Sequence, residues 1–206
     1  MAKLALFLEG ACEQNAIRFY LQNYVPHILV TMDVLEFIES TTSIVLLYDC
    51  GGYQNVLPKA KEYESTLWND SLVLVRDLET TPCFATLKDE VAHEIPRLRG
   101  QAIKYALFSK PYLESVYQCD LTLFHRVMTQ LYKETHGAVS PTPVTFSPGL
   151  NNIDWNNPLP SLKGFCRVHN MGFQKVKVAQ KFFSQLNYPS IQSHYLVRLR
   201  DLFSGL

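Results

Sequence analysis

Residues Leu4–Glu13 read LALFLEGACE, and in this stretch five apolar residues run directly into a carboxylate and a glycine. A continuous apolar run of this length is typical of a strand buried on both faces of a parallel sheet. Gly10 permits a tight exit from that strand, and a helix-forming segment follows. Because open α/β sheets build their sites at the carboxyl ends of their strands, Glu9 becomes a candidate functional residue.

Two later apolar runs also end in acids: residues 44–49 (IVLLYD) and residues 72–79 (LVLVRDLE). One residue separates Asp77 from Glu79, so in an extended segment both side chains point to the same side. Hard divalent cations take oxygen ligands. We therefore hypothesise that Glu9, Asp77 and Glu79 converge on one Mg²⁺ or Mn²⁺ ion. The alternative is that these acids are solvated strand ends or helix N-caps.

The sequence does not decide between alternative roles for two further acidic residues. Glu13 lies four residues after Glu9, in the first turn of the expected helix. It could hold a second metal or act as a general base, or it could simply complement the positive helix N-terminus. Asp49 precedes Gly51 and Gly52, so it could join the metal site or accept hydrogen bonds within a turn.

Composition restricts the class of protein. The chain has 206 residues, 47% hydrophobic and 18% charged, which predicts a globular fold with a sizeable core. No apolar run reaches membrane-spanning length and no N-terminal leader pattern is present, so we expect a cytoplasmic protein without a membrane partner. The five cysteines are scattered and odd in number, which argues against a disulfide framework or a zinc site.

The charges are unevenly distributed. Residues 1–94 carry 14 acids and 6 bases, whereas residues 95–206 carry 5 acids and 13 bases. Between Lys163 and Arg200 there are seven Lys or Arg residues and no acid. This asymmetry suits a metal site beside an anion-binding surface. It is equally consistent with two halves that attract each other and pack.

The order of elements predicts an α/β fold with a helical C-terminal extension. Strands and helices alternate to about residue 95, which favours a parallel sheet flanked by helices. In this part Pro26 should end the first helix, residues 28–32 should form a strand, and residues 34–38 are ambiguous. Asn55 is a possible N-cap, with Pro58 in the first turn of its helix.

Beyond Pro96 we expect no further strand. The expected helices are 98–108, 112–118, 121–134, 173–186 and 191–204. Residues 136–162 are rich in Pro, Ser, Thr and Asn, and we expect a functional loop or an insertion wrapped on the surface. The predicted division is therefore 1–95 and 96–206, packed as one compact unit.

The acidic motifs resemble a known domain. Glu9-Gly10-x-x-Glu13 after a buried first strand resembles the first motif of the Toprim domain, which occurs in topoisomerases, primases and overcoming-lysogenization-defect nucleases. Residues 49–56 (DCGGYQNV) resemble the Gly-Gly-x-x-Asn turn of the nuclease branch. Residues 75–79 (VRDLE) stand where that branch has Asp-x-Asp, with Glu79 replacing the second Asp. The resemblance covers residues 3 to about 95.

The remainder is similar to compact stand-alone Toprim-like proteins, through residues 106–111 (ALFSKP), 175–179 (KVKVA) and 196–202 (LVRLRDL). The resemblance implies a Mg²⁺-dependent nuclease, or a related phosphoryl-transfer protein acting on nucleic acid, in anti-phage defence or repair. Glu9 and Asp77 would hold the metal with support from Glu79. Glu13 would hold a second metal or activate water.

Basic residues of the C-terminal half could line a nucleic-acid path through sequence-independent phosphate contacts. They are Lys175, Lys177, Lys181, Arg167, Arg198 and Arg200. The alternative is an ordinary amphipathic helix with a solvated basic face. Only the absence of counter-charges in this segment favours the functional interpretation.

Two other functions stay open at this point. One is a non-enzymatic interaction protein with an idle acidic cluster, which would work with a partner ATPase or with nucleic acid. The other is a phospho-receiver-like switch, which would need a lysine at the end of a later strand.

Overall fold

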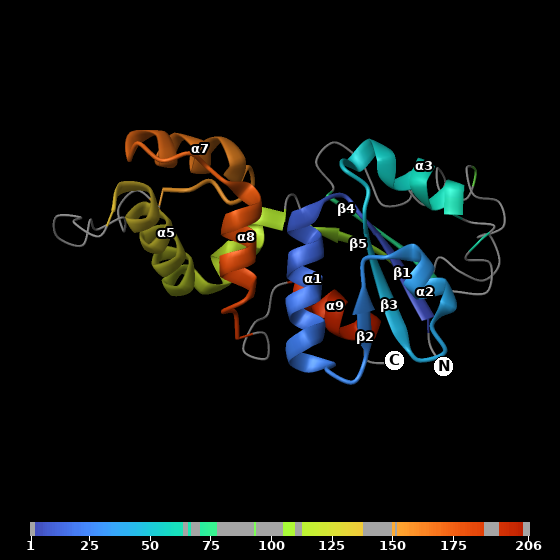
Figure 1. The fold of residues 1–206 in the computed structure, drawn as a ribbon. Coiled ribbons are helices and arrows are strands. Elements are labelled where there is room, and N and C mark those ends of the chain that lie inside the picture. Colours follow the sequence, from blue (N-terminus) through green and yellow to red (C-terminus); the bar gives the residue numbers. More distant parts are fainter. Residues whose placement is uncertain are drawn as a thin grey trace.

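The computed structural model describes residues 3–63, 66, 71–77, 93, 105–109, 113–137, 150, 152–187 and 194–203. Within these residues a five-stranded sheet has the order β2-β3-β1-β4-β5, and every neighbouring pair is parallel (Figure 1). The strands are β1 (Lys3–Leu8), β2 (Leu29–Thr31), β3 (Ile44–Asp49), β4 (Ser71–Asp77) and β5 (Tyr105–Ser109). The expected α/β class is confirmed.

Both faces of the sheet are buried, as the continuous apolar runs predict. In β1, Leu4, Leu6 and Leu8 belong to one core, while Ala5 and Phe7 belong to the core on the opposite face. The same alternation holds in β3 and β4. A strand with apolar side chains on both faces must lie between two covering layers, and the strand order places β1 at the centre of the sheet.

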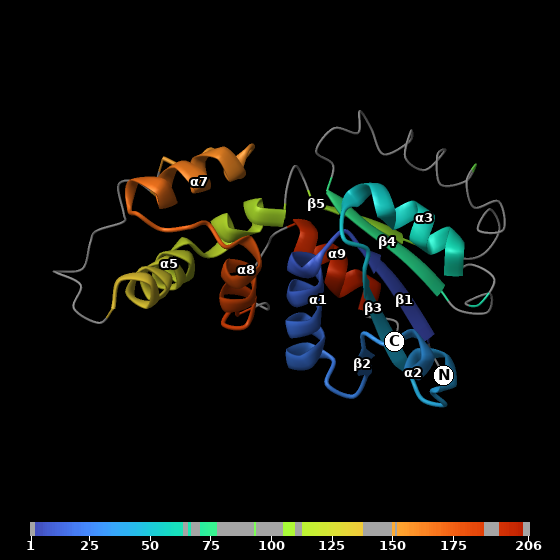
Figure 2. The same cartoon turned by 45° about the horizontal axis from the view of Figure 1, so that its top comes forward.

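Helices cover the two faces unequally. Helices α2 (Val34–Glu39) and α3 (Tyr53–Tyr63) pack on one face through Phe37, Val56 and Ala60. The other face carries α1 (Ala11–Tyr24) and α9 (His194–Phe203). Beside α1 lies a group of helices that we call the helical lobe: the 3₁₀ helix η2 (Leu113–Asp120), α5 (Leu121–His136), α7 (Pro158–Val168) and α8 (Lys175–Phe183). Figure 2 shows this lobe at one end of the molecule, with α8 against α1.

The lobe has an aromatic core. Tyr117 of η2 stacks on Phe124 of α5 at 5.0 Å between ring centroids and meets Phe182 of α8 edge-on at 4.8 Å. These rings belong to the same buried cluster as Leu6 and Leu8 of β1. The lobe therefore shares one apolar core with the sheet. None of the described helices combines the length and the apolar character that crossing a membrane requires.

Local signals explain several helix boundaries. Helix α1 ends at Tyr24, two residues before Pro26, as predicted. The ambiguous segment 34–38 is helical because the Asp33 carboxylate caps it, accepting from Leu35 N at 2.7 Å and Glu36 N at 3.1 Å.

Helix α3 differs from the prediction. It begins at Tyr53, so Asn55 lies inside the helix and Pro58 is an interior residue instead of a first-turn one. The Asn55 amide does not cap the helix, because Nδ2 donates backwards to Cys50 O at 3.0 Å.

The expectation of no strand after residue 95 was wrong. Residues 105–108 were expected to be helical, but β5 adds to the sheet beside β4, with Val75 opposite Leu107. A short apolar run cannot be assigned to helix or strand by periodicity alone. The sheet thus continues past residue 95, and the later strand that a phospho-receiver needs exists, although Lys110 after it lies outside the described residues.

Helix α7 also departs from the expected irregular segment 136–162, because it begins at Pro158, a residue suited to a first helical turn. Residues 138–149 and 151 lie outside the described part. The expected helices at 121–134, 173–186 and 191–204 correspond to α5, α8 and α9.

Candidate functional site at the carboxyl edge of the sheet

Glu9 is held between two neighbouring segments by its own backbone. Its N–H donates to Val75 O of β4 at 3.2 Å, and its carbonyl accepts from Gly52 N at 2.7 Å. Cys50 N donates to Leu8 O at 3.0 Å, which ties the same turn to the end of β1. The Glu9-Gly10 motif and the Gly51-Gly52 turn therefore meet at one edge of the sheet.

Asp77 reaches the same edge. It is the last residue of β4, the parallel neighbour of β1, and Val75 pairs with Leu8 two residues before it. Nothing further is described of the Asp77 side chain, and Glu79 lies outside the described residues. Among the residues that are described, no group of three or more His, Cys, Asp or Glu could hold a metal ion. The convergence of Glu9, Asp77 and Glu79 on one metal stays a prediction.

Asp49 serves the turn that follows β3. Its Oδ1 accepts from Gly51 N at 2.8 Å, as an acid that begins a turn does. Gly51 and Gly52 have φ of +70° and +138°, both in the region that favours glycine. The turn brings Gly52 N to the Glu9 carbonyl, so its backbone conformation positions the candidate site.

We expect Gly52→Ala to lower the free energy of unfolding by about 1–3 kcal/mol, because an alanine at φ +138° is strained. Gly51→Asn is the matched control, since asparagine tolerates φ near +70°. Urea denaturation of both variants measures the difference. Equal destabilisation by the two changes would contradict this account of the turn.

Glu13 is buried at the N-terminus of α1. Its side chain is 3% exposed, and Oε2 lies 3.7 Å from the position a Cβ would take at Gly10. Burial raises the pKa of Glu13 from 4.5 to about 8, against the opposing effects of a backbone hydrogen bond and the charge of Lys175. At neutral pH the carboxyl is therefore mostly protonated. It could act as a base or a metal ligand only after a bound cation displaces its proton.

Glu114 was missed by the sequence analysis and lies beside Glu13. It is fully buried in η2, and its Oε1 forms an ion pair with Lys175 Nζ of α8 at 2.9 Å. Burial lowers the pKa of Lys175, but the charge and hydrogen bond of Glu114 outweigh this and raise it. The only sequence signal was an acid within the apolar segment 112–117, which is typical of a paired buried charge.

The basic segment contains no acid in sequence, but acids from other elements supply counter-charges to it. Lys177 and Lys181 both bind Glu134 of α5, at 2.9 and 2.7 Å. These contacts lower the pKa of Glu134 through hydrogen bonds from the two lysines. The acids that neutralise α8 come from η2 and α5, which are distant in the sequence. The nucleic-acid contacts themselves stay a prediction.

Within the described residues, the predicted arginines outside α8 are less engaged in ion pairs than the lysines of α8. Arg167 is exposed on α7, and no ion pair is found for it among the described residues. Arg200 is exposed on α9, with Nε 3.8 Å from Asp201 Oδ1. The side chain of Arg198 lies outside the described part of the chain.

Comparison with known proteins supports the fold. No family model matches the sequence, and no curated protein matches it significantly. Among solved structures, the C-terminal region of the Burkholderia pseudomallei OLD protein matches with a TM-score of 0.55 at 14% identity. The match covers 100% of this chain and 98% of that one. The chain has the fold of an OLD C-terminal region.

The likeness to the OLD structure reaches further than the sequence motifs. The motifs stop near residue 95, whereas the structural match includes the helical lobe. At this level of identity it shows the fold alone. The sheet and the lobe of this chain are thus arranged as in the OLD region.

Proposed function

We propose that this chain is a divalent-metal-dependent nuclease that hydrolyses phosphodiester bonds in nucleic acid. The observation that carries the proposal is the position of Glu9, held by hydrogen bonds between the Gly51-Gly52 turn and β4. Three motifs of the Toprim resemblance, far apart in the sequence, thereby belong to one sheet edge. The likeness to the OLD region supports the same assignment at the level of the fold.

The donors at this edge suit a hard cation. Glu9 and Asp77 would hold Mg²⁺ or Mn²⁺, and Glu79 would support it. The buried Oε1 of Glu13 has no hydrogen-bond partner among the described residues, as a second ligand position requires. Bound metal supplies Lewis-acid stabilisation of phosphoryl oxygens. Glu9 and Asp77 would hold the cation that the scissile phosphate meets. Glu13, once deprotonated, would accept a proton from the water that attacks phosphorus, and the oxygen released when the P–O bond breaks would take its proton from solvent.

Nucleic-acid phosphates would meet the cations of the C-terminal half. Lys175 is already engaged with Glu114, so we assign the contacts to Arg167, Lys177 and Lys181, together with Arg198 and Arg200 of α9. Lys177 and Lys181 are partly exposed and could exchange Glu134 for phosphate. Such contacts weaken as salt rises, because counterions released from the nucleic acid favour binding only at low salt.

The experiment compares cleavage of labelled single- and double-stranded DNA and RNA by wild type, Glu9→Gln and Asp77→Asn in Mg²⁺ or Mn²⁺. We expect each variant to lose at least about a hundredfold in rate, as when a transition-state contact is removed. Glu39→Gln is the matched control and should keep wild-type activity. Glu39 is an exposed acid in the helix that leads into the opposite, amino end of β3.

Thermal unfolding with Mn²⁺ provides a second readout that does not require activity. A ligand that binds only the folded chain adds about 2.7 kcal/mol at a hundredfold excess over its dissociation constant. Mn²⁺ should raise the Tm of wild type but not that of Asp77→Ala. Equal shifts in both proteins, or cleavage that survives both edge substitutions, would exclude the proposed site.

The second candidate is an interaction protein with an idle acidic cluster. It is favoured by the neutralisation of α8, since Glu114 and Glu134 leave less free positive charge than the sequence indicates. If the chain bound neither Mn²⁺ nor nucleic acid at low salt, the interaction protein would be the remaining candidate function. A partner ATPase and a role in anti-phage defence or repair follow from the resemblance only and stay predictions.

A further inference from the structure

One surface of the sheet unit is both apolar and acidic. Five of the eight large hydrophobic side chains that are exposed in the described residues lie between residues 24 and 38. No Lys or Arg occurs between Arg18 and Lys59. Lys3 does reach the end of α2, where its Nζ donates to the backbone carbonyls of Phe37 and Ile38 at 2.8 and 2.9 Å. Glu36 and Glu39 therefore outnumber one cation there. We define the α2 face as Met32, Leu35, Glu36, Ile38 and Glu39, with Leu35 68% exposed. Clustered exposed apolar side chains beside like charges are typical of an interaction site.

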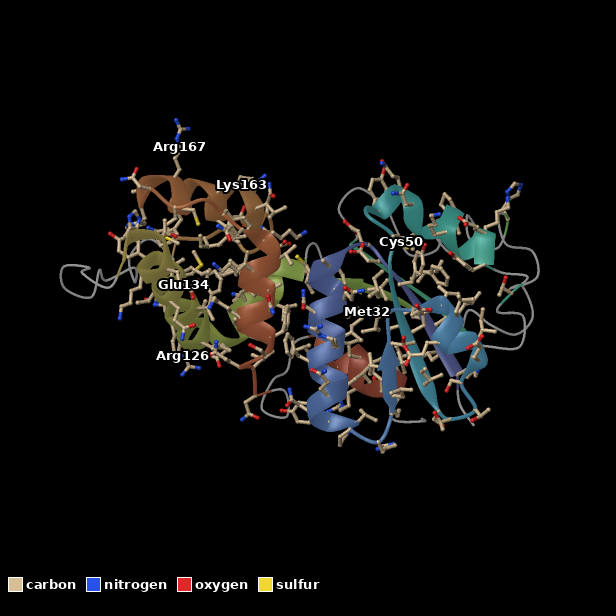
Figure 3. All side chains as sticks on the ribbon, viewed as in Figure 1. Met32, Cys50, Arg126, Glu134, Lys163 and Arg167 are labelled. Carbon is tan, nitrogen blue, oxygen red and sulfur yellow. The ribbon has the colours of Figure 1, made fainter. Side chains whose placement is uncertain are left out.

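A surface of opposite character lies on α7. Its exposed residues follow helical spacing and form what we call the α7 face: Pro160, Lys163, Gly164, Arg167 and Val168. Val168 is 79% exposed between small and cationic neighbours. No ion pair is found for Lys163 or Arg167 within the described residues, and Figure 3 shows the Arg167 side chain directed away from the lobe.

The two faces lie at opposite ends of the molecule. Helix α2 packs on the side of the sheet away from α1, whereas α7 is in the lobe, and both Figure 1 and Figure 2 place them far apart. They cannot meet within one chain. We propose that the α2 face docks on the α7 face of a second copy of this chain, with Leu35 and Ile38 against Gly164 and Val168.

Charge and symmetry favour a second copy as the occupant. Glu36 and Glu39 would meet Lys163 and Arg167, so the two surfaces are complementary in charge. One Glu36 oxygen already accepts from Thr31 Oγ1, which leaves the other for the cation. In a two-fold pair the contact occurs twice, because each copy offers both faces. Such a pair also sets the acidic half of one chain, residues 1–94, beside the basic half of the other. The pairing does not depend on the metal site of the nuclease proposal, but it uses Arg167, so within a pair the phosphate contacts fall to Lys177, Lys181 and the cations of α9.

The test measures molar mass by light scattering and sedimentation equilibrium. At about 0.1 M salt, where the Debye length is about 10 Å, we expect twice the chain mass of 23.6 kDa. Toward about 1 M salt, where it is about 3 Å, the mass should fall toward one chain. Lys163→Glu/Arg167→Glu and Leu35→Lys/Glu39→Lys should each be monomeric at low salt.

Mixing the two variants is the decisive step. The reversed α2 face then meets a reversed α7 face, while the second contact keeps its native charges, so a pair should form again at low salt. Because every substituted residue is exposed, both variants should fold, and recovery on mixing excludes misfolding as the cause. Arg126→Glu/Lys133→Glu on α5 makes the same charge change elsewhere on the lobe and should keep the wild-type mass.

Several outcomes would overturn the pairing. A wild type that stays at one chain mass at every concentration excludes it, as does a mixture that stays monomeric. A pair that survives both reversals uses another surface, and open-ended larger species exclude the closed two-fold form. A monomeric wild type whose α7 variant loses affinity for nucleic acid would assign those cations to phosphate contacts instead.

Discussion

Lys175→Met should lower the free energy of unfolding by about 3 kcal/mol at neutral pH, measured by urea denaturation. Glu114 is fully buried and its ion pair with Lys175 spans 2.9 Å. Removing one partner of a buried pair leaves an uncompensated charge and costs about 3–5 kcal/mol. The lower end applies because the Lys175 side chain is 35% exposed, so water can reach part of the gap. Methionine keeps the aliphatic stem, which isolates the loss of charge.

Lys177→Met is the matched control on the same helix. Its partner Glu134 is 41% exposed, so solvent screens this pair and its loss should change stability far less than the loss of the Lys175 pair. The double variant Lys175→Met/Glu114→Gln should recover much of the lost stability, because no buried charge is left. If Lys175→Met were as mild as Lys177→Met, the Lys175–Glu114 pair would not contribute to stability as a buried ion pair does.

Glu13→Gln should stabilise the chain at pH 8 and leave it unchanged near pH 4. The folded chain keeps the Glu13 proton up to a pKa of about 8, whereas the ordinary value is 4.5. Between these values the unfolded chain binds fewer protons, so the free energy of unfolding falls as pH rises, by about 1.4 kcal/mol per unit. The contribution is complete below pH 4.5 and is lost as pH rises through 8. Over the shift from 4.5 to about 8 the total loss is about 5 kcal/mol, and glutamine avoids it.

The measurement is urea denaturation at several pH values with a chelator present, because a cation bound to Glu13 would favour the carboxylate. Glu62→Gln, at an exposed position of α3 outside both proposed docking faces, should change stability little at any pH. A Glu13→Gln curve that runs parallel to the wild type from pH 4 to 8 would show that Glu13 is not held protonated by burial.

The first strand was predictable because its short apolar run is bounded by a glycine that ends it. The run Leu4–Leu8 is apolar at every position and is followed by Gly10, which favours a short strand covered on both faces, and β1 is such a strand. The acids at the ends of β1 and β4 were placed at one edge by the parallel order alone. Tyr105–Ser109 was not predictable in this way, since its strand identity comes from pairing with β4.

The electrostatics could not be read from local sequence. Lys181 and Glu134 are 47 residues apart, and Lys175 and Glu114 are brought together only by the packing of α8 on η2. Sequence counts therefore overstated the free positive charge of α8. The pKa of Glu13 likewise depends on burial by elements from both halves of the chain, which no spacing rule contains.

The C-terminal elements pack against the N-terminal ones, and this packing limits how the chain can be divided for expression. β5 covers the outer side of β4, α8 lies against α1, and Phe203 of α9 stacks on Tyr20 of α1 at 5.9 Å. A fragment ending at residue 95 would present an open strand edge and an uncovered apolar helix, both of which promote aggregation. The two halves would fold as separate polypeptides only when produced together, as in a split protein reassembled from complementing fragments.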